Sequence, residues 1–233
     1  MNDKVLYIVV GCKPWNKRVF DEKISRYSGE WHYINSREAL TIENLSKLNP
    51  RRIFFLHWSW KVPAAIIETY ECVCFHMTDV PYGRGGSPLQ NLIIRGHRKT
   101  KLTALRMTES FDAGPVYLKC DLSLEGSAEE IFIRGAELAA DMVLEMNTQN
   151  PEPKPQAGTP TVFKRRKPEE SRIVAAKHLR SLYDFVRMLD ADGYPKAFMI
   201  HEGFRYEFSR AALKDGRICA DVEITKIEEE TNT

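Results

Sequence analysis

Two patterns of hydrophobic and polar positions alternate along the first third of the chain. Short continuous apolar runs have the pattern of strands that are buried on both faces. The segments between them carry apolar side chains at helical spacing. The strand-like segments are 5–10, 31–34, 52–56 and 72–75, and the helical segments are 17–27, 38–48 and 63–70. This alternation predicts right-handed βαβ units and a mainly parallel, Rossmann-like α/β sheet.

The pattern changes after residue 76, where a turn-rich segment begins. Ser87 and Pro88 form a suitable cap and first turn for a following helix. We expect a helix over 88–95, strands over 101–107 and 116–121, and the longest amphipathic helix of the chain over 128–147. The apolar face of this last helix should close the first domain.

The last third of the chain predicts a small second unit. A proline-rich linker at 150–155 and a basic run at 164–167 precede it. We expect a helix over 177–189, strands over 197–201, 204–208 and 218–224, and a disordered tail over 228–233. The predicted organisation is a larger α/β domain over 1–160 and a small C-terminal α+β appendix over 168–227.

Composition excludes several classes of protein. The 233 residues include 34 Lys and Arg against 32 Asp and Glu, so the formal charge of +2 predicts no general attraction to polyanions. No apolar stretch has the length of a signal peptide core or a membrane span. Five cysteines without a metal or redox spacing indicate a reduced, cytoplasmic compartment. The six histidines show no ligand spacing, so we expect no metal.

The candidate chemistry lies just after the fourth apolar run. His76 follows a buried strand, at the sheet edge where open α/β folds bind their ligands, and Asp112 lies on a nearby loop. Neutral imidazole accepts a proton near neutral pH, and a carboxylate can fix its tautomer and stabilise imidazolium. Taken singly, such a histidine is more often structural, and an Asp-Ala-Gly loop is usually only a turn.

The combined order of these features resembles the folate-dependent formyltransferases, in the methionyl-tRNA and sugar N-formyltransferase branch. That branch has a pattern close to Asn-x-His-x-Ser-x-Leu-Pro-x-x-Arg-Gly-x-x-Pro, followed later by Asp-x-Gly. The matching positions are His76, Thr78, Pro81, Arg84, Gly85, Pro88, Asp112 and Gly114. The stretch 189–198 is also similar to the accessory domain of the family. The resemblance implies 10-formyltetrahydrofolate as the formyl donor.

One position departs from the family pattern. Cys74 stands where the family has an asparagine that is thought to bond the formyl oxygen as it becomes anionic. A thiol is a weak donor, and the loss of one such donor typically costs about 10²–10³ in rate. The candidate replacements are His57, Thr78, Ser59 and Asn91, of which His57 is preferred because it also ends a strand at this edge.

The resemblance assigns roles to several residues. His76 would stabilise the oxyanion and take up the proton of the amine, and Asp112 would orient and charge-compensate His76, directly or through a water. The expected folate-binding residues are His57, Trp58, Ser59, Lys61, Phe111 and Asp112, whereas Trp60 is expected to pack in the interior. The expected acceptor-binding residues are Tyr82, Arg84, Gly85, Gly86 and Ser87.

The identity of the acceptor is inferred from length and charge. The chain is short and nearly neutral, whereas a transfer-RNA substrate demands a positive surface. We therefore expect a nucleotide-linked amino sugar, a UDP- or dTDP-4-amino-4,6-dideoxy sugar of a bacterial surface glycan, and no nucleic acid partner. The alternatives are another amine, such as glycinamide ribonucleotide or methionyl-tRNA, and a catalytically degenerate relative that only binds folate or a sugar nucleotide. A homodimer is expected.

Overall fold

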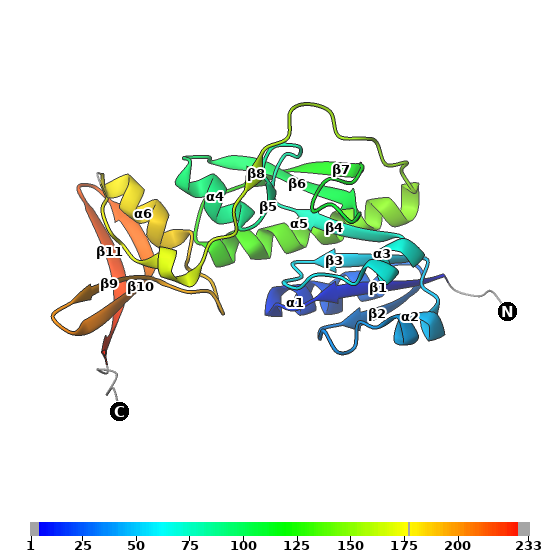
Figure 1. The fold of residues 1–233 in the computed structure, drawn as a ribbon, viewed down its shortest axis with the longest axis horizontal. Helices are drawn as coiled ribbons and strands as arrows, with labels where there is room; N and C mark the ends of the chain where they lie inside the picture. The colour runs from blue at the N-terminus through cyan, green and yellow to red at the C-terminus, as the bar shows by residue number, and fades with distance from the viewer. Residues whose placement is uncertain (1–4, 177, 228–233) are drawn as a thin grey trace.

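The centre of the larger part of the molecule is a six-stranded sheet (Figure 1). The computed structural model describes residues 5–176 and 178–227, so the expected disordered tail lies outside the described residues. The strands lie in the order β2-β1-β3-β4-β6-β7. Their bounds are β1 Leu6–Gly11, β2 Glu30–Ile34, β3 Arg52–Leu56, β4 Cys72–His76, β6 Lys99–Arg106 and β7 Val116–Ser123. The first four strands pair in parallel and the last two antiparallel, which confirms the predicted α/β fold class.

Helices cover both faces of this sheet. Consecutive residues of β1, such as Val9 and Val10, point to opposite faces of the sheet and belong to separate hydrophobic cores. One core includes side chains of α1 (Pro14–Glu22) and α5 (Ala128–Gln149), and the other includes side chains of α2 (Ile42–Leu48) and α3 (Ala64–Thr69). A parallel sheet buried on both faces explains why its strands are continuous apolar runs. The carboxyl ends of β1, β3 and β4 therefore share one edge.

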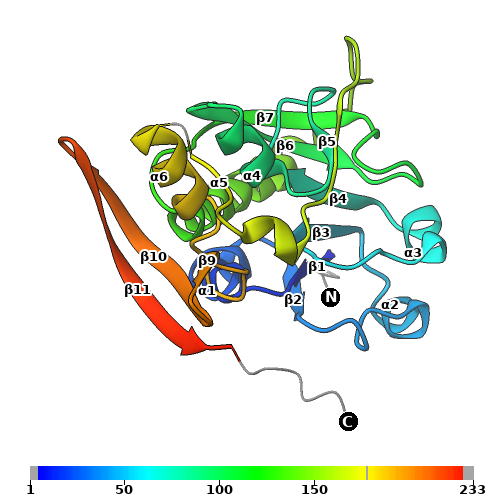
Figure 2. The ribbon, with the colours of Figure 1, turned by 60° about the vertical axis from the view of Figure 1, so that its left-hand side comes forward.

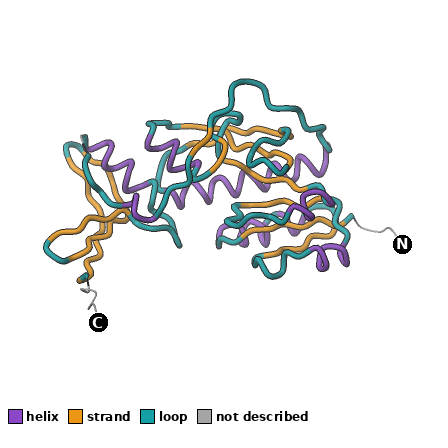
Figure 3. Tube along the Cα trace, in the orientation of Figure 1, coloured by secondary structure: helices purple, strands orange, loops and turns teal. Residues whose placement is uncertain are grey.

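A second, two-stranded sheet was not predicted from the sequence. Strand β5 (Arg84–Gly85) pairs in parallel with β8 (Val162–Phe163), although the 76 residues 86–161 lie between them in the sequence. The intervening chain leaves α5 and arches over the molecule before it reaches β8, as the loop in Figure 3 shows. The segment between the two predicted domains is thus attached to the glycine-rich turn that follows β4.

The appendix contains an antiparallel sheet in the order β11-β10-β9. Its elements are α6 (Leu179–Arg187), β9 (Ala197–His201), β10 (Phe204–Lys214) and β11 (Arg217–Lys226). The β10–β11 hairpin extends away from the larger domain (Figure 2). Where the appendix meets the larger domain, the buried Arg187 of α6 donates to the carbonyls of Leu124 and Gly126 at 2.6 and 2.8 Å. These bonds hold the appendix against the start of α5.

Element boundaries differ from the sequence predictions at several places. The segment predicted as one helix over 17–27 forms α1 and a short 3₁₀ helix, Ile24–Arg26, and the helix predicted over 38–48 begins only at Ile42. Helix α4 (Pro88–Ile94) begins at the expected proline, but Ser87 does not cap it. Instead, the Ser87 hydroxyl accepts a hydrogen bond from the Arg166 backbone N–H at 3.0 Å. No helix within 5–176 or 178–227 has the length and apolar character of a membrane span.

Candidate active site

A cavity of about 850 Å³ lies at the carboxyl edge of the parallel strands. Its wall includes the end of β3, the end of β4 and the inner face of α5. Most of the lining is apolar, and its aromatic members are Trp15, Phe55, Trp58, Trp60, Phe75, Phe111, Phe132 and Tyr194. This volume suits a ligand of drug-like size, and the few polar groups in the wall are therefore the ones able to orient it.

His76 is the last residue of β4 and has one ring nitrogen fixed. The side chain is 8% exposed, and its Nε2 atom lies 2.8 Å from the carbonyl oxygen of Gly83. A carbonyl oxygen only accepts, so Nε2 carries the hydrogen. In neutral His76 the lone pair is consequently on Nδ1.

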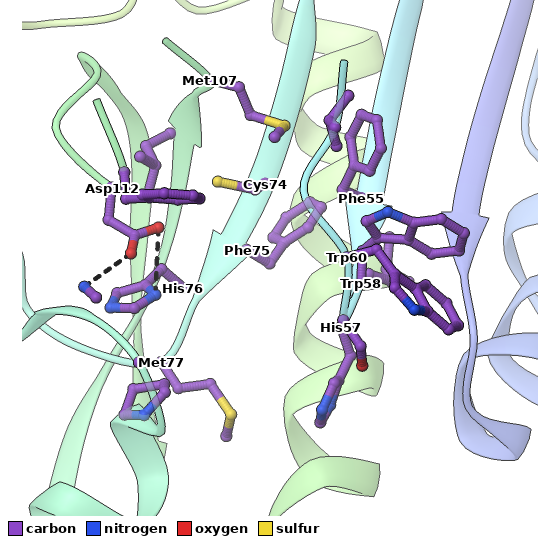
Figure 4. Close-up of a pocket in the computed structure, with 18 of the residues that line it drawn as sticks. Phe55, His57, Trp58, Trp60, Cys74, Phe75, His76, Met77, Met107 and Asp112 are labelled. Atoms are coloured by element: carbon purple, nitrogen blue, oxygen red, sulfur yellow. Dashed lines mark hydrogen bonds and ion pairs between the residues drawn. The ribbon is translucent and has the colours of Figure 1, made fainter. Parts of the chain in front are cut away.

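Asp112 faces that second nitrogen (Figure 4). Its Oδ1 atom lies 3.5 Å from Nδ1 of His76, and its Oδ2 atom accepts a hydrogen bond from the Gly85 backbone N–H at 2.9 Å. The Asp112 backbone has a φ of 52°, in the left-handed region that aspartate tolerates better than most residues. A proton that reaches Nδ1 would lie next to a carboxylate held in place by a main-chain donor, an arrangement suited to general base chemistry.

Cys74 lines the same cavity and precedes His76 by two residues on β4. Met107, which follows β6, lines the cavity as well. Burial raises the pKa of the Cys74 thiol, and the nearby Asp112 carboxylate raises it further. The neutral thiol offers only a weak donor at the place where the family pattern has an amide.

His57 follows β3 and is held on two sides. Its Nε2 atom lies 2.5 Å from the Tyr194 hydroxyl oxygen, and its ring lies edge-on to that of Phe132 at 4.5 Å between centroids. Burial, with a smaller contribution from the charge of Lys13, lowers the pKa of His57 to about 4. A donor from this side chain near neutral pH would therefore be a neutral imidazole N–H.

The expected folate-binding residues all line the cavity. His57, Trp58, Ser59 and Lys61 come from the loop after β3, and Phe111 and Asp112 come from the loop before β7. Trp60 also lines the cavity and is 43% exposed, so its expected packing in the interior is wrong. Phe111, at 68% exposed, presents its ring at the mouth.

The expected acceptor residues divide into two groups. Gly85, Gly86 and Ser87 line the cavity, whereas Tyr82 and Arg84 do not. The Tyr82 hydroxyl pairs with His97 at 3.1 Å. The Arg84 guanidinium is directed to Gln156.

Two of the suggested oxyanion donors also lie away from the cavity wall. Thr78 is fully buried, and its hydroxyl donates to the Gly83 carbonyl at 3.3 Å. The Asn91 amide donates to main-chain carbonyls, including that of Gly86 at 3.1 Å. His57 and Ser59 remain as candidates that line the cavity.

Sequence reasoning missed three residues that belong to the site or its support. Arg165 and Tyr194 line the cavity, and Gln156 holds the Asp112 loop. All three lie in segments without hydrophobic periodicity: Arg165 in the predicted basic run, Gln156 directly after the predicted linker, and Tyr194 between the predicted helix and strand of the appendix. The described residues contain no group of three or more His, Cys, Asp or Glu side chains placed to hold a metal ion.

Comparison with known proteins assigns the family. Residues 168–225 match the family model described as the methionyl-tRNA formyltransferase C-terminal domain. The methionyl-tRNA formyltransferase of Rickettsia felis is 32% identical over 135 residues, or 56% of this chain and 43% of that protein. A methionyl-tRNA formyltransferase structure from Clostridium thermocellum is 46% identical, with a TM-score of 0.90 over 95% of this chain and 99% of that one.

The chain belongs to the formyltransferase family. The family uses 10-formyltetrahydrofolate, as the sequence resemblance implied. HypX from Aquifex aeolicus, solved in complex with tetrahydrofolic acid, shares the formyltransferase fold at 18% identity, with a TM-score of 0.71 over 90% of this chain and 38% of HypX. This formyltransferase spans less than half the length of the curated Rickettsia relatives that it matches.

The comparisons overturn the expected acceptor. The prediction of a nucleotide-linked amino sugar, and with it the exclusion of a nucleic acid partner, is wrong, because the relatives at 32% and 46% identity are named methionyl-tRNA formyltransferases. The prediction relied on the net charge of +2, which averages over the whole surface. It also relied on the shortness of the chain, whereas residues 168–225 match the C-terminal domain model of the transfer-RNA enzyme.

Proposed function

We propose that this formyltransferase transfers the formyl group of 10-formyltetrahydrofolate to the α-amino group of methionyl-tRNA. The observation that carries the proposal is the facing pair of His76 Nδ1 and Asp112 Oδ1, 3.5 Å apart, in the wall of a large cavity. It occurs in a chain that is 46% identical to a methionyl-tRNA formyltransferase over nearly the whole of both chains.

The cavity fits the proposed formyl donor. A folate has flat ring systems and a charged glutamate end, and the wall combines several aromatic side chains with few polar ones. Trp58 and Trp60 lie edge to face at 4.7 Å between centroids beside the cationic Lys61. The rings would enclose the donor, and Lys61 would favour its carboxylates.

The chemical step uses the fixed tautomer of His76. The amine nitrogen bonds to the formyl carbon, and its proton passes to Nδ1 of His76, the ring nitrogen that is not committed to Gly83. Asp112 stabilises the resulting imidazolium. The bond between the formyl carbon and the folate nitrogen then breaks, and that nitrogen takes up the proton as tetrahydrofolate leaves.

Local charge at the cavity supports a polyanionic acceptor. Lys61 and Arg165 both line the wall, and neither forms an ion pair within the described residues. Lys13 lies beside the same corner, 4.7 Å from the centroid of the Tyr194 ring. Cations that are not neutralised by carboxylates are available to the phosphates at the aminoacylated end of a transfer RNA.

The direct test incubates the purified protein with 10-formyltetrahydrofolate and methionyl-tRNA and measures formylmethionyl-tRNA by acid gel electrophoresis or mass spectrometry. Deacylated transfer RNA and free methionine serve as controls. We expect formylation of methionyl-tRNA that weakens as salt rises, because counterions compete for the phosphate contacts. Absence of the product, with efficient formylation of a different amine, would contradict the proposal.

A further inference from the structure

Two residues of the segment after β4, Gly83 and Gly85, each bond one member of the facing pair. The Gly83 carbonyl accepts from Nε2 of His76 at 2.8 Å, and the Gly85 N–H donates to Oδ2 of Asp112 at 2.9 Å. The Arg84 side chain between them does not enter the cavity. It donates to Oε1 of Gln156 from Nε at 3.1 Å and from Nη2 at 2.8 Å.

The Gln156 amide, which accepts from Arg84, also donates to the Asp112 loop. Its Nε2 atom donates to the main-chain carbonyls of Asp112 and Gly114, both at 2.8 Å. Carbonyls only accept and a guanidinium only donates, so the partners fix the orientation of the amide. Every amide hydrogen of Gln156 is used, and its oxygen takes two bonds from Arg84.

The chain that carries Gln156 is anchored at both ends. On one side, Lys154 and Val116 exchange two backbone hydrogen bonds of 2.8 Å. On the other, the Thr161 carbonyl accepts from the Arg84 N–H at 3.0 Å, and its hydroxyl accepts from the Gly83 N–H at 2.7 Å. Gln156 is therefore presented to the Asp112 loop by a fixed strap of residues 154–163, hereafter the strap.

The Asp112 loop needs such support. Asp112 has a φ of 52°, in the left-handed region that is unfavourable for residues with a side chain. One of the two carbonyls belongs to Asp112 itself, so that bond fixes the peptide unit that follows Asp112, and the bond to Gly114 holds the end of the loop. Without them, the loop could relax and carry the carboxylate away from Nδ1 of His76.

We propose that Gln156, oriented by Arg84, is a positioning residue for Asp112, and that the strap is part of the active site although it does not line the cavity. This inference rests on the proposed function only for its kinetic readout. It assigns a role to two side chains that do not line the cavity. Substitution of either side chain should therefore lower kcat without weakening substrate binding.

The test compares Gln156→Glu with Gln149→Ala. Glutamate keeps the acceptor for Arg84 but cannot donate to the two carbonyls. Gln149 is exposed at the end of α5 and forms no side-chain hydrogen bond within the described residues, so its variant controls for a glutamine change nearby. We expect kcat to fall by about 10- to 100-fold in Gln156→Glu with both KM values within about twofold, because small displacements of reacting groups are costly.

A second readout does not depend on turnover. The ¹H,¹⁵N resonance of the Gly85 amide reports its hydrogen bond to Asp112, and the Asp112→Ala variant supplies the position for a broken bond. We expect Gln156→Glu and Arg84→Ala to move the resonance toward that position, and Gln149→Ala to leave it unchanged. If the wild type transferred no formyl group to methionyl-tRNA, the proposed function would fail while this readout still decided the inference.

Two results would overturn the positioning role. One is an unchanged Gly85 resonance in both Gln156→Glu and Arg84→Ala. The other is a lower melting temperature with unchanged kcat, which is the result expected of a merely structural residue. A double variant of Arg84→Ala and Gln156→Glu should lose no more activity than the worse single variant, because both act through one bond network.

Discussion

Nδ1 of His76 lies 3.5 Å from Oδ1 of Asp112, while Nε2 of the same ring is committed to the Gly83 carbonyl. The main chain, and not the carboxylate, therefore selects the tautomer. This differs from the sequence-based expectation that Asp112 would orient the ring. Asp112 is left to compensate the charge of a proton taken up at Nδ1.

Replacing Asp112 by asparagine should separate charge from shape. Asparagine tolerates the left-handed backbone and fits the same space, but it carries no negative charge to stabilise imidazolium. We expect kcat for methionyl-tRNA formylation to fall by about 10²–10⁴, with an unchanged melting temperature. Glu109→Gln is the matched control, since Glu109 lines the same cavity without contacting His76. An Asp112→Asn rate near that of the control would contradict the assigned role.

Cys74 offers a gain-of-function test. Cys74→Asn should raise kcat by up to about 100-fold, because it restores an amide donor where the family pattern has one. Cys74→Ala should stay within about twofold of wild type, since a buried neutral thiol is a weak donor. Single-turnover formylation measures both. A large loss in Cys74→Ala would instead mean that the thiol itself takes part in the reaction.

His57 predicts a dependence of stability on acid pH. Its pKa is lowered to about 4 in the folded chain, while an unfolded histidine titrates near 6.5. Between these values the unfolded chain binds more protons, so the unfolding free energy should fall as pH decreases from about 6.5 to 4. Above pH 6.5 the histidine is neutral in both states and the unfolding free energy no longer depends on it. Between pH 4 and 6.5 the unfolding free energy changes by at most about 1.4 kcal/mol per pH unit.

Urea unfolding of wild type and His57→Asn between pH 4 and 8 measures this contribution. Asparagine suits the φ of 51° at this position and does not titrate in this range. The pH slope should be shallower in His57→Asn, whereas His201→Asn, at an exposed site, should retain the wild-type slope. Equal slopes in all three proteins would exclude the buried neutral state of His57.

Gly114 should be intolerant of any side chain. A Cβ atom there would lie 1.8 Å from the carbonyl oxygen of Arg106, so the Asp112 loop would have to move. We expect Gly114→Ala to lower the unfolding free energy by about 3 kcal/mol and to abolish most activity. Gly96→Ala is the control, because its Cβ meets nothing within 4 Å and costs only backbone strain. Calorimetric melting and kcat together test the contrast.

The local pattern was sufficient for the parallel sheet and for the location of the site. Val9 and Val10 lie in different cores, so both faces of β1 required apolar residues and the run was continuous. The carboxyl-edge rule then placed His76 and the loop after β3 around one cavity. The domain boundaries at 160 and 168, the residue roles and the homodimer stay predictions.

Long-range pairing could not be read from local sequence. Strand β8 has only two residues, and Val162 and Phe163 carry no periodic signal. Gln156 lies among prolines that indicate an extended linker, and its partners are more than 40 residues away. Tyr194 likewise reaches His57 across 137 positions. Each contact depends on the tertiary path of the chain, which composition and spacing do not encode.

The parallel pairing of β5 with β8 also sets an order of events during synthesis. His76, Asp112 and all six strands of the main sheet precede residue 124, whereas the strap ends at Phe163. Because domains begin to fold from the N-terminal side as the chain emerges, the sheet can pair before the strap exists. A nascent chain therefore carries both reacting side chains before it carries the amide that aims one at the other. If Gln156 positions Asp112 as proposed, catalytic competence is acquired as a late step, separate from formation of the sheet.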